Sequence, residues 1–316
     1  MPRVSVIIPT HNRAHLLERA IKSAFGAGRD VEVVVVDDAS TDETPQMCRS
    51  LAGVRYVRAE RNQKLGGARN LGILASTGDY ISFLDDDDLK LPGSLDVQLD
   101  ALMRQPEAGM VYGQALLGDQ DCLPTGNLYP QGCPHGDIFW DLLEKNFIPC
   151  PSVLFRKSCL YRIGLLSDAT PGIEDWDLWL RIAELYPVAA VEEPLAIYRR
   201  ASPSSGQYTS KAAEMVGLIT RTWRTRWIKL ARAGAADESK RKEAWRRLSQ
   251  NMANHLVWEA GRELLCRHPL RAQKNLLVGL RLHPLGMLHR TTRPSNFRFL
   301  ARLLGGWLET RKAVAP

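Results

Sequence analysis

The chain has 316 residues, of which 45% are hydrophobic and 24% charged, an ordinary globular composition with room for a large buried core. No apolar run approaches the roughly 18 residues that a membrane span needs, and the start, MPRVSVIIPTHNR, lacks the pattern of a signal peptide. We therefore expect a cytoplasmic protein. Its six cysteines include no C-x-x-C pair, which argues against a zinc site or a redox dithiol.

Charge is distributed unevenly along the chain. Residues 1–200 carry 20 Lys/Arg and 28 Asp/Glu, whereas residues 201–316 carry 22 Lys/Arg and seven Asp/Glu. The Ser/Pro/Gly stretch ASPSSGQ (201–207) lies where the sign changes. We therefore expect a catalytic domain over 1–205 and a basic, mostly helical region over 206–316.

Segments typical of strands and of helices alternate in the first hundred residues. Apolar and β-branched runs predict strands at 4–10, 31–38, 54–60 and 79–85. Each run is followed by a segment with helical spacing, at 14–25, 44–52, 66–76 and 91–104. This alternation predicts an α/β fold with a mostly parallel, doubly wound sheet and helices on both faces.

The pattern is less regular between residues 105 and 200. Residues 113–137 are rich in Gly, Pro and Asp and predict hairpins or loops, whereas 151–158 predicts a further strand. A helix is expected over 173–186, with acidic residues in its first turn, and strands over 188–200. Beyond residue 206, nearly every segment predicts a helix.

Polar residues follow three of the predicted strands: PTHNR after the first, DDASTD after the second and DDDD after the fourth. The carboxyl ends of parallel strands meet at one edge of a sheet, where α/β proteins bind ligands. Carboxylates such as those of residues 85–88 are the ligands that Mg²⁺ or Mn²⁺ prefers, and Mg²⁺ usually also binds substrate phosphates. The alternative interpretation of this run is a solvated acidic turn.

Three further segments contain residues of similar chemistry. Asp38 follows a buried strand and can accept a pyrimidine imide N–H or bind a ribose; the alternative is a capping turn. The segment NQKLGGARNLG (62–72), which contains GGARN, predicts a Gly-rich loop that opens a helix, with Arg69 suited to phosphate or a base. The segment GIEDWDLWLR (172–181) contains acids that can act as a general base; the alternative is compensation of the helix dipole.

A resemblance rests on four of these segments together. VSVIIPTHNR, VVVVDDASTDET, GGARNLGILASTGDYISFLDDDD and GIEDWDLWLRI occur in this order and at fitting distances. They resemble the family-2 nucleotide-sugar glycosyltransferases of the GT-A fold. The resemblance covers about residues 3–200 and is highly specific as an ordered set, whereas residues 206–316 are only loosely similar to the family.

The resemblance implies a donor site, a metal ligand and a catalytic base. The residues that it implies for the donor nucleotide are Pro9, Thr10, His11, Asp38, Arg69, Asp85 and Asp86. Asp87 would ligate a Mn²⁺ or Mg²⁺ cofactor, and Asp175 would be the general base. Glu174 and Trp176 would contact the acceptor or the transferred sugar, and Asp88 would be structural.

The sequence departs from the family pattern near the end of the predicted domain. Many relatives have Tyr-Arg-x-His there, and the His can help to bind the metal. This chain has YRRAS (198–202), with Ala201 at the position of that His. The departure puts the role of residues 198–206 in metal binding in doubt.

The resemblance also implies an activity. A metal-dependent, inverting hexosyltransferase would move a sugar from a nucleotide-diphosphate donor, by preference a UDP-sugar, to a hydroxyl of a glycan or lipid-linked acceptor, as in cell-surface polysaccharide biosynthesis. Two other classes stay as alternatives: a metal-dependent phosphohydrolase or nucleotidyltransferase, and a nucleic-acid-binding module in which Trp223 and Trp227 stack on bases. No nucleic-acid motif is present, so nucleic acid is not an expected partner.

The basic C-terminal region predicts contact with an anionic membrane surface. In 297–312 one helical face carries Leu300, Leu303, Leu304, Trp307 and Leu308, with basic residues beside or beyond it. The segment 221–233 repeats the pattern with its two tryptophans and Leu230. Such helices can lie in a lipid interface, which would place the enzyme peripherally on the inner face of the membrane. The alternative is packing on the catalytic domain or within a homo-oligomer.

Overall fold

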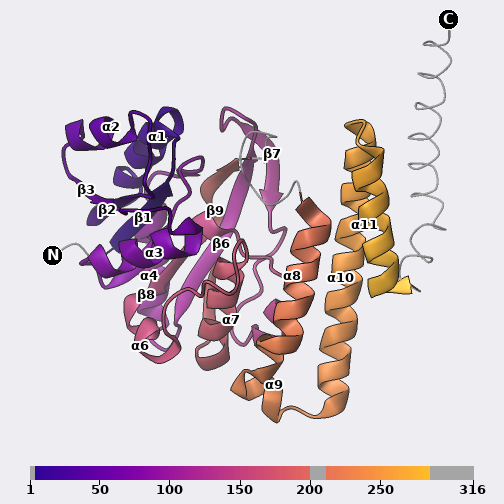
Figure 1. Ribbon diagram of the computed structural model, residues 1–316. Coiled ribbons are helices and arrows are strands. Elements are labelled where there is room, and N and C mark those ends of the chain that lie inside the picture. Colours follow the sequence, from indigo (N-terminus) through magenta and orange to yellow (C-terminus); the bar gives the residue numbers. More distant parts are fainter. Residues whose placement is uncertain (1–3, 200–210, 285–316) are drawn as a thin grey trace, which may run out of the picture. The chain divides into compact units, whose positions relative to one another are not determined.

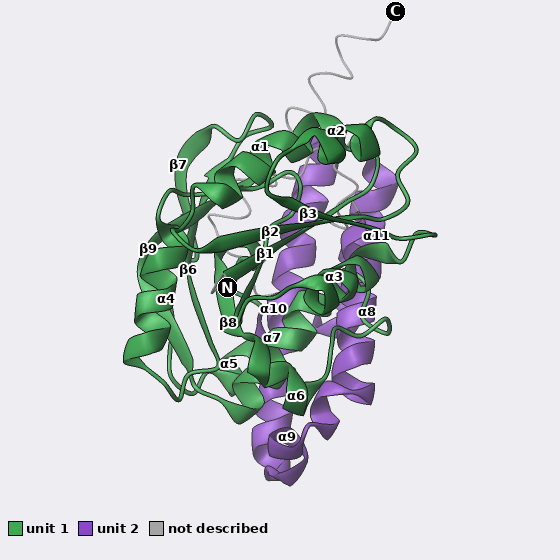
Figure 2. Cartoon of the chain, turned by 90° about the vertical axis from the view of Figure 1, so that its left-hand side faces the viewer, with its two compact units in different colours: residues 1–142, 146–207 green, residues 143–145, 208–316 purple. Residues whose placement is uncertain are grey.

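The structure is a computed structural model that describes residues 4–199 and 211–284 (Figure 1). Contacts between Cα atoms divide the chain into two compact units. Unit 1 comprises Met1–Leu142 and Asn146–Gln207, and unit 2 comprises Leu143–Lys145 and Tyr208–Pro316. Figure 2 colours the two units separately.

A nine-stranded sheet forms the centre of unit 1. Its order is β3-β2-β1-β4-β8-β6-β9-β5, with β7 paired to β6. The bounds of the strands are β1 Val4–Thr10, β2 Val31–Asp37, β3 Val54–Arg58, β4 Tyr80–Phe83, β5 Leu89–Lys90, β6 Met110–Gly118, β7 Pro124–Tyr129, β8 Val153–Arg156 and β9 Val188–Arg199. Strands β1 to β4 are parallel to one another, as the alternation predicts.

Helices cover both faces of this sheet (Figure 1). The longer helices of unit 1 are α1 Ala14–Phe25, α2 Thr44–Ser50, α3 Lys64–Ala75, α4 Ser94–Arg104 and α7 Glu174–Leu185, and the short ones are α5 Phe139–Glu144 and α6 Leu160–Ile163. Apolar residues of α1 and α4 pack with Val6, Ile8 and Val35 in one core cluster. Val6, Ile8 and Val35 share this face because successive side chains of a strand alternate between the two sides of the sheet.

Helix α3 lies very close to the opposite face. A Cβ atom on Gly72 would come within 2.3 Å of Ile7 Cγ2 and 3.1 Å of Val36 Cγ2, so only glycine fits there. Farther along this face, Trp179 of α7 packs against Phe83 and Phe155, with ring centroids 6.1 and 5.8 Å away. These contacts fix α3 and α7 next to the carboxyl end of β4, where the acidic run begins.

The second half of the sheet departs from the regular alternation. Strand β8 is antiparallel to β4 and β6, and the expected strands of 188–200 form the single strand β9, parallel to β6. The Gly-, Pro- and Asp-rich segment supplies part of β6 and all of β7, an antiparallel pair. The short strand β5 was not predicted because two residues carry no periodicity. The expectation of an α/β fold with helices on both faces is confirmed, but the sheet is mixed: β1 to β4 are parallel, whereas β5, β7 and β8 pair antiparallel with their neighbours.

The described part of unit 2 is helical. Its helices are α8 Ala212–Thr225, α9 Ala231–Ala235, α10 Glu238–Leu265 and α11 Pro269–Leu282. Within residues 4–199 and 211–284, no helix is both long enough and apolar enough to cross a membrane. Trp223 and Trp227 are 6% and 0% exposed, and α8 ends at Thr225. The expectation that 221–233 is one helix with a lipid-facing stripe is therefore wrong, because its tryptophans belong to the core.

Candidate active site

The carboxyl ends of β1, β2 and β4 lie at one edge of the sheet and bring together the polar residues that follow them. Parallel pairing sets Thr10 opposite Asp37 and Ile7 opposite Phe83, so the residues after these strands share one edge of the sheet. Thr10 Oγ1 donates a 2.8 Å hydrogen bond to Asp86 Oδ2 across 76 residues of sequence. The predicted convergence of the first and fourth strand ends is therefore present as a direct contact.

Arg13 neutralises part of the aspartate run. Its Nη1 lies 2.8 Å from Asp86 Oδ1 and 3.3 Å from Asp87 Oδ2. Both aspartates are buried. Burial raises the pKa of Asp86 to about 6, although the attraction of Arg13 opposes the shift. Burial also raises the pKa of Asp87, and the negative charge of Asp85 adds to that rise.

A second arginine, at the end of β9, completes the surroundings of this run. Arg199 Nη1 lies 3.3 Å from Asp87 Oδ2, and the backbone N–H of Arg199 donates a 2.8 Å bond to Asp88 Oδ1. The other oxygen of Asp88 is buried and has no hydrogen-bond partner among the described residues. Burial raises the pKa of Asp88 well above its usual range. Asp88, expected to be structural, ties β9 to the aspartate run.

Arg69 joins the aspartate run to the acidic start of α7. Its Nη2 donates to Asp85 Oδ1 at 2.7 Å and its Nη1 to Glu174 Oε1 at 3.0 Å. The guanidinium also lies over the ring of Phe83, 5.1 Å from the centroid. Arg69 and Glu174 have side chains only 2% exposed, whereas that of Asp85 is 25% exposed. The two acidic segments, 86 residues or more apart in sequence, are therefore one electrostatic unit.

Asp175 is the partly exposed acid of the α7 start. Its Oδ1 accepts a hydrogen bond from the backbone N–H of Trp176 at 2.7 Å. Burial raises the pKa of Asp175 to about 6, the charge of Glu174 adds to the rise, and Arg69 opposes it. A carboxylate with this pKa is mostly ionised at neutral pH and more basic than an ordinary aspartate, which suits a general base.

The residues expected to surround the nucleotide base lie at the carboxyl ends of β1 and β2. Asp38 is buried, and its Oδ1 accepts the N–H of Gln63 at 2.5 Å. His11 is exposed, and its Nδ1 lies 2.7 Å from the carbonyl oxygen of Asp38. Pro9 is buried in β1. Asp37, the residue before Asp38, accepts hydrogen bonds from Tyr56, Arg58 and the backbone N–H of Ser40. These contacts stabilise the fold.

Three sequence expectations for this region differ from the structure. The GGARN segment is not a loop, because α3 already begins at Lys64 and both glycines lie inside it. Trp176, expected to contact a sugar, is 3% exposed and its indole N–H donates to the Leu142 carbonyl oxygen at 2.7 Å. The Trp176 ring therefore belongs to the core, and Glu174 holds Arg69 instead of facing solvent.

Sequence reasoning assigned no role to Arg13, Arg199 or Lys90. The two arginines stand in quoted motifs, PTHNR and YRRAS, but periodicity does not show that both reach Asp87. Lys90 Nζ donates to Ser82 Oγ and the Pro151 carbonyl oxygen, both at 2.6 Å. Burial lowers the pKa of Lys90 to about 7. The one sequence signal for a buried Lys90 near the site is its position two residues after the aspartate run.

The described residues contain no group of three or more His, Cys, Asp and Glu side chains arranged to hold one metal ion. Mg²⁺ is commonly bound by one or two carboxylates together with substrate phosphates, so a full protein cage is not required. Asp87, with two 3.3 Å contacts to arginines, and the unpartnered oxygen of Asp88 are oxygen donors of the right chemistry. Ala201 lies outside the described residues.

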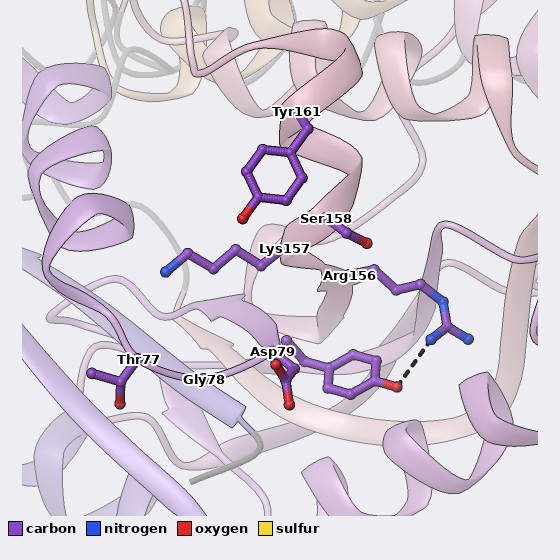
Figure 3. Close-up of a pocket in the computed structure, with 8 residues that line it drawn as sticks. Thr77, Gly78, Asp79, Arg156, Lys157, Ser158 and Tyr161 are labelled. Atoms are coloured by element: carbon purple, nitrogen blue, oxygen red, sulfur yellow. Dashed lines mark hydrogen bonds between the residues drawn. The ribbon is translucent and has the colours of Figure 1, made fainter. Parts of the chain in front are cut away.

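A pocket of about 350 Å³ lies at the other end of β4, away from the aspartate run (Figure 3). Figure 3 shows Arg156, Lys157 and Tyr161 around it. Arg156 donates to Tyr80 and to the carbonyl oxygens of Ala108 and Leu102, and Lys157 donates to Ser76. Several N–H groups of these cations are therefore already used within the protein.

Solved structures identify the class of fold. The mannosyltransferase PcManGT from Pyrobaculum calidifontis, in complex with GDP-Man and Mn²⁺, aligns with a TM-score of 0.55 and 21% identity over 91% of this chain and 87% of that one. S. aureus TarS 1–349, in complex with UDP-GlcNAc, aligns with a TM-score of 0.53 and 15% identity over 92% of this chain and 93% of that one. The fold is of the GT-A type with a helical C-terminal region, as expected.

Sequence comparison identifies the family. The family model described as Glycosyl transferase family 2 matches residues 5–163, half of the chain. The chain belongs to this family, so the resemblance drawn from its four ordered segments is confirmed.

Curated relatives match parts of longer proteins. A glycosyltransferase of Rickettsia felis is 31% identical over 195 residues, 59% of this chain and 32% of that protein. The GalNAc(5)-diNAcBac-PP-undecaprenol beta-1,3-glucosyltransferase of Campylobacter jejuni is 38% identical over 126 residues, 37% of this chain and 39% of that protein. The succinoglycan biosynthesis protein ExoO of Rhizobium meliloti is 43% identical over 98 residues, 30% of this chain and 28% of that protein. This chain thus spans less than half of each.

Proposed function

We propose that the chain is a metal-dependent, inverting glycosyltransferase that moves a hexose from a nucleotide-diphosphate donor to an acceptor hydroxyl. The observation that carries this proposal is the buried Arg69, which joins Asp85 at the end of β4 to Glu174 at the start of α7. Asp175 follows Glu174 in α7, where burial raises its pKa and the charge of Asp85 contributes to that rise. A donor site and a general base are the two parts that a direct displacement needs.

The proposed reaction is a single displacement. Asp175 takes the proton of the acceptor hydroxyl as its oxygen attacks the anomeric carbon of the sugar. The bond to the nucleoside diphosphate breaks on the opposite side, and the configuration at the anomeric carbon inverts. Glu174 acts on this step only through Arg69, because both of its oxygens are engaged, one by Arg69 and one by the Gly172 N–H.

The donor would lie along the carboxyl ends of β1, β2 and β4. Asp38 with Pro9, Thr10 and His11 would surround the nucleotide base, and Asp85 would reach the ribose. Asp86 would lie near the transferred sugar, and Asp87 would ligate Mn²⁺ or Mg²⁺. A bound dication stabilises the charge of the departing diphosphate. Support for the ion comes from the crowding of Asp86, Asp87 and Asp88, because burial raises the pKa of each.

The donor and acceptor classes follow from the relatives. Both aligned glycosyltransferase structures contain a nucleotide sugar, UDP-GlcNAc or GDP-Man, and we favour a UDP-sugar here. The Campylobacter relative is named for an undecaprenol-linked glycan and ExoO for succinoglycan. We therefore propose a glycan or lipid-linked acceptor, as in cell-surface polysaccharide biosynthesis.

An acceptor of this kind gives a reason for membrane contact. We propose that the enzyme acts in the cytoplasm and touches the inner face of the membrane through residues 297–312, which lie outside the described residues. The balance of 22 Lys/Arg against seven Asp/Glu after residue 200 supports this. The alternative partner is a second copy. Large apolar side chains on α10 and α11 are exposed, namely Trp258, Leu265, Leu270, Leu277 and Leu280.

The two other classes have less support. A phosphohydrolase or nucleotidyltransferase does not agree with the family match over residues 5–163. A nucleic-acid module would need Trp223 and Trp227 to stack on bases, and both are buried. We therefore carry neither forward.

A donor-hydrolysis screen tests the proposal. The purified chain is incubated with UDP-, GDP- and TDP-sugars, with Mn²⁺ or with EDTA, and release of nucleoside diphosphate is measured. We expect slow hydrolysis of one donor class with Mn²⁺ and none with EDTA. Release from no donor by a folded protein, or equal release with EDTA, would contradict the proposal.

A further inference from the structure

Arg13 stands out because it pairs with two proposed donor-site residues although the proposed reaction gives it no part. It precedes α1, and its Nη1 is shared between Asp86 Oδ1 at 2.8 Å and Asp87 Oδ2 at 3.3 Å. Its side chain is 23% exposed, whereas those of the two aspartates are 5% and 3% exposed. A partly exposed cation therefore covers two buried carboxylates.

The contacts to Asp86 and Asp87 differ in quality. Asp86 accepts two bonds of 2.8 Å, from Thr10 and Arg13. Asp87 Oδ2 faces two guanidinium nitrogens, of Arg13 and Arg199, and both lie 3.3 Å away. Charge-assisted N–H to carboxylate bonds are usually about 2.7–2.9 Å long. Asp87 therefore makes the longer hydrogen bonds of the two, and its carboxylate is the more available to another cation.

The two arginines differ in exposure. Arg199 donates its Nε to the Gln120 carbonyl oxygen at 2.7 Å and its backbone N–H to Asp88 at 2.8 Å, and its side chain is 10% exposed. Arg13 is more exposed and sits at the start of α1, beside Asn12 in the left-handed region with φ 55°. Of the two guanidinium groups, that of Arg13 is the more accessible to a ligand.

We propose that Arg13 is an exchangeable counter-ion: it holds Asp87 in the empty site and transfers its guanidinium to the diphosphate of the donor when a dication occupies Asp87. The inference rests on the proposed donor site. Two cations close to one carboxylate oxygen repel each other, so Arg13 and a dication compete for Asp87. A diphosphate supplies the replacement partner, because the planar fork of arginine matches phosphate oxygens.

This arrangement predicts two effects of opposite sign. Replacing Arg13 by Met removes the competitor, so Mn²⁺ alone should bind at least about fivefold more tightly, the lower end of ordinary coupling between ligands. The same change removes a charged hydrogen bond to the diphosphate, so UDP at saturating Mn²⁺ should bind about tenfold to a hundredfold more weakly. A residue with a merely structural role would weaken both.

The experiment measures Mn²⁺ binding by electron paramagnetic resonance and UDP binding by calorimetry. Four proteins are compared: the wild type, Arg13→Met, Arg13→Lys and the control Arg55→Gln. Arg55 is also paired with an acid, Glu32, but in β3 away from the aspartates, so its loss should change neither affinity. Arg13→Lys keeps the charge but loses the fork, so it should keep the wild-type Mn²⁺ affinity and lose part of the UDP affinity.

The outcomes separate this inference from the proposed function. If the wild type binds UDP only with Mn²⁺, but folded Arg13→Met binds Mn²⁺ no more tightly, the exchange is wrong and the donor site stands. If Arg13→Met binds Mn²⁺ more tightly while the wild type binds no UDP, competition at Asp87 holds and the nucleotide role fails. Unchanged UDP affinity in Arg13→Met would also overturn the transfer to diphosphate.

Discussion

The charged side chains at the two ends of strand β4 have different partners. At its amino end, Arg156 and Lys157 each donate to backbone carbonyl oxygens of neighbouring segments, at 2.7–2.9 Å. At its carboxyl end, three consecutive aspartates are buried together, and burial raises the pKa of each. One of their oxygens has no hydrogen-bond partner among the described residues.

The difference distinguishes polar groups that hold the fold from those that wait for a ligand. A cation that donates to carbonyl oxygens of neighbouring segments contributes to stability. Crowded carboxylates oppose one another and cost stability until a cation binds. Strongly perturbed acids in one place therefore indicate a functional site. Changes at the carboxyl end should mainly affect binding and rate, and changes at the amino end mainly stability.

The largest effect is expected at Asp175. Asp175→Asn should lower the transfer rate by about 10²–10⁴, because removing a general base typically costs that much. Donor binding and the thermal melt should stay near the wild-type values, because the amide is nearly isosteric. Steady-state kinetics and calorimetry with the donor measure both. Asp177→Asn is the control, since Asp177 is buried and paired with Arg181; wild-type turnover in Asp175→Asn would exclude Asp175 as the base.

Arg69 sharpens the comparison because it is a structural group inside the reactive end. Arg69→Met leaves Glu174 buried without its counter-charge, which should cost about 3–5 kcal/mol of unfolding free energy. The double change Arg69→Met with Glu174→Gln should regain part of that stability but not the transfer activity. Urea unfolding measures the first effect and an activity assay the second. A double variant as active as the wild type would show that the Arg69 bridge does not position the site.

Arg156 tests the amino end. Arg156→Met removes the donors to the carbonyl oxygens of Ala108 and Leu102, and each buried acceptor left unpaired costs about 1–3 kcal/mol. Urea unfolding should show this loss while calorimetry with UDP and Mn²⁺ shows unchanged affinity. The exposed Arg162, changed to Met, is the matched control for a change of charge. Loss of UDP affinity in a folded Arg156→Met protein would break the division between the two ends.

The pH dependence follows from the raised pKa of Asp175. The base works only when ionised, and burial places its pKa at about 6. The ratio kcat/KM should therefore fall about tenfold per unit as pH decreases below about 6 and level off above it. A profile measured from pH 4.5 to 8 checks this. A break near pH 4 would mean that Asp175 has an ordinary carboxyl pKa in solution.

The smallest effect is expected for membrane contact. Basic residues near an anionic leaflet contribute about 1 kcal/mol each, so the single change Arg298→Gln should reduce binding to anionic liposomes only about fivefold. Flotation at low and high salt measures it, with neutral liposomes as the control. A wild-type chain that stays at the bottom at low salt would assign the apolar stripe of 297–312 to packing or to an oligomer.

The sequence was sufficient for the regular half of the fold and for the acidic residues that follow β2 and β4. Strand β1 and helix α1 match the predicted bounds because their hydrophobic periods are long and uninterrupted. The antiparallel insertion of β8 depends on long-range pairing, which no local period encodes. Arg13 and Arg199 were missed for the same reason: their partner Asp87 is 74 and 112 residues away.

Sequence also could not distinguish an exposed aromatic side chain from a buried one. Trp176 and Trp223 both stand beside charged residues, and each has a core position instead of a ligand-facing one. Near the end of a helix, the spacing of a few apolar residues fits more than one face. Only tertiary packing decides which face is covered.

The central claim, that the aspartate run at the end of β4 is a metal-assisted nucleotide site, has one direct test. UDP is added to the wild type and to Asp87→Ala in a calorimeter, with Mn²⁺ and with EDTA. We predict binding to the wild type only with Mn²⁺, and loss of that metal-dependent part in Asp87→Ala. Equal UDP affinity with Mn²⁺ and with EDTA, or full Mn²⁺ dependence in Asp87→Ala, would contradict the claim.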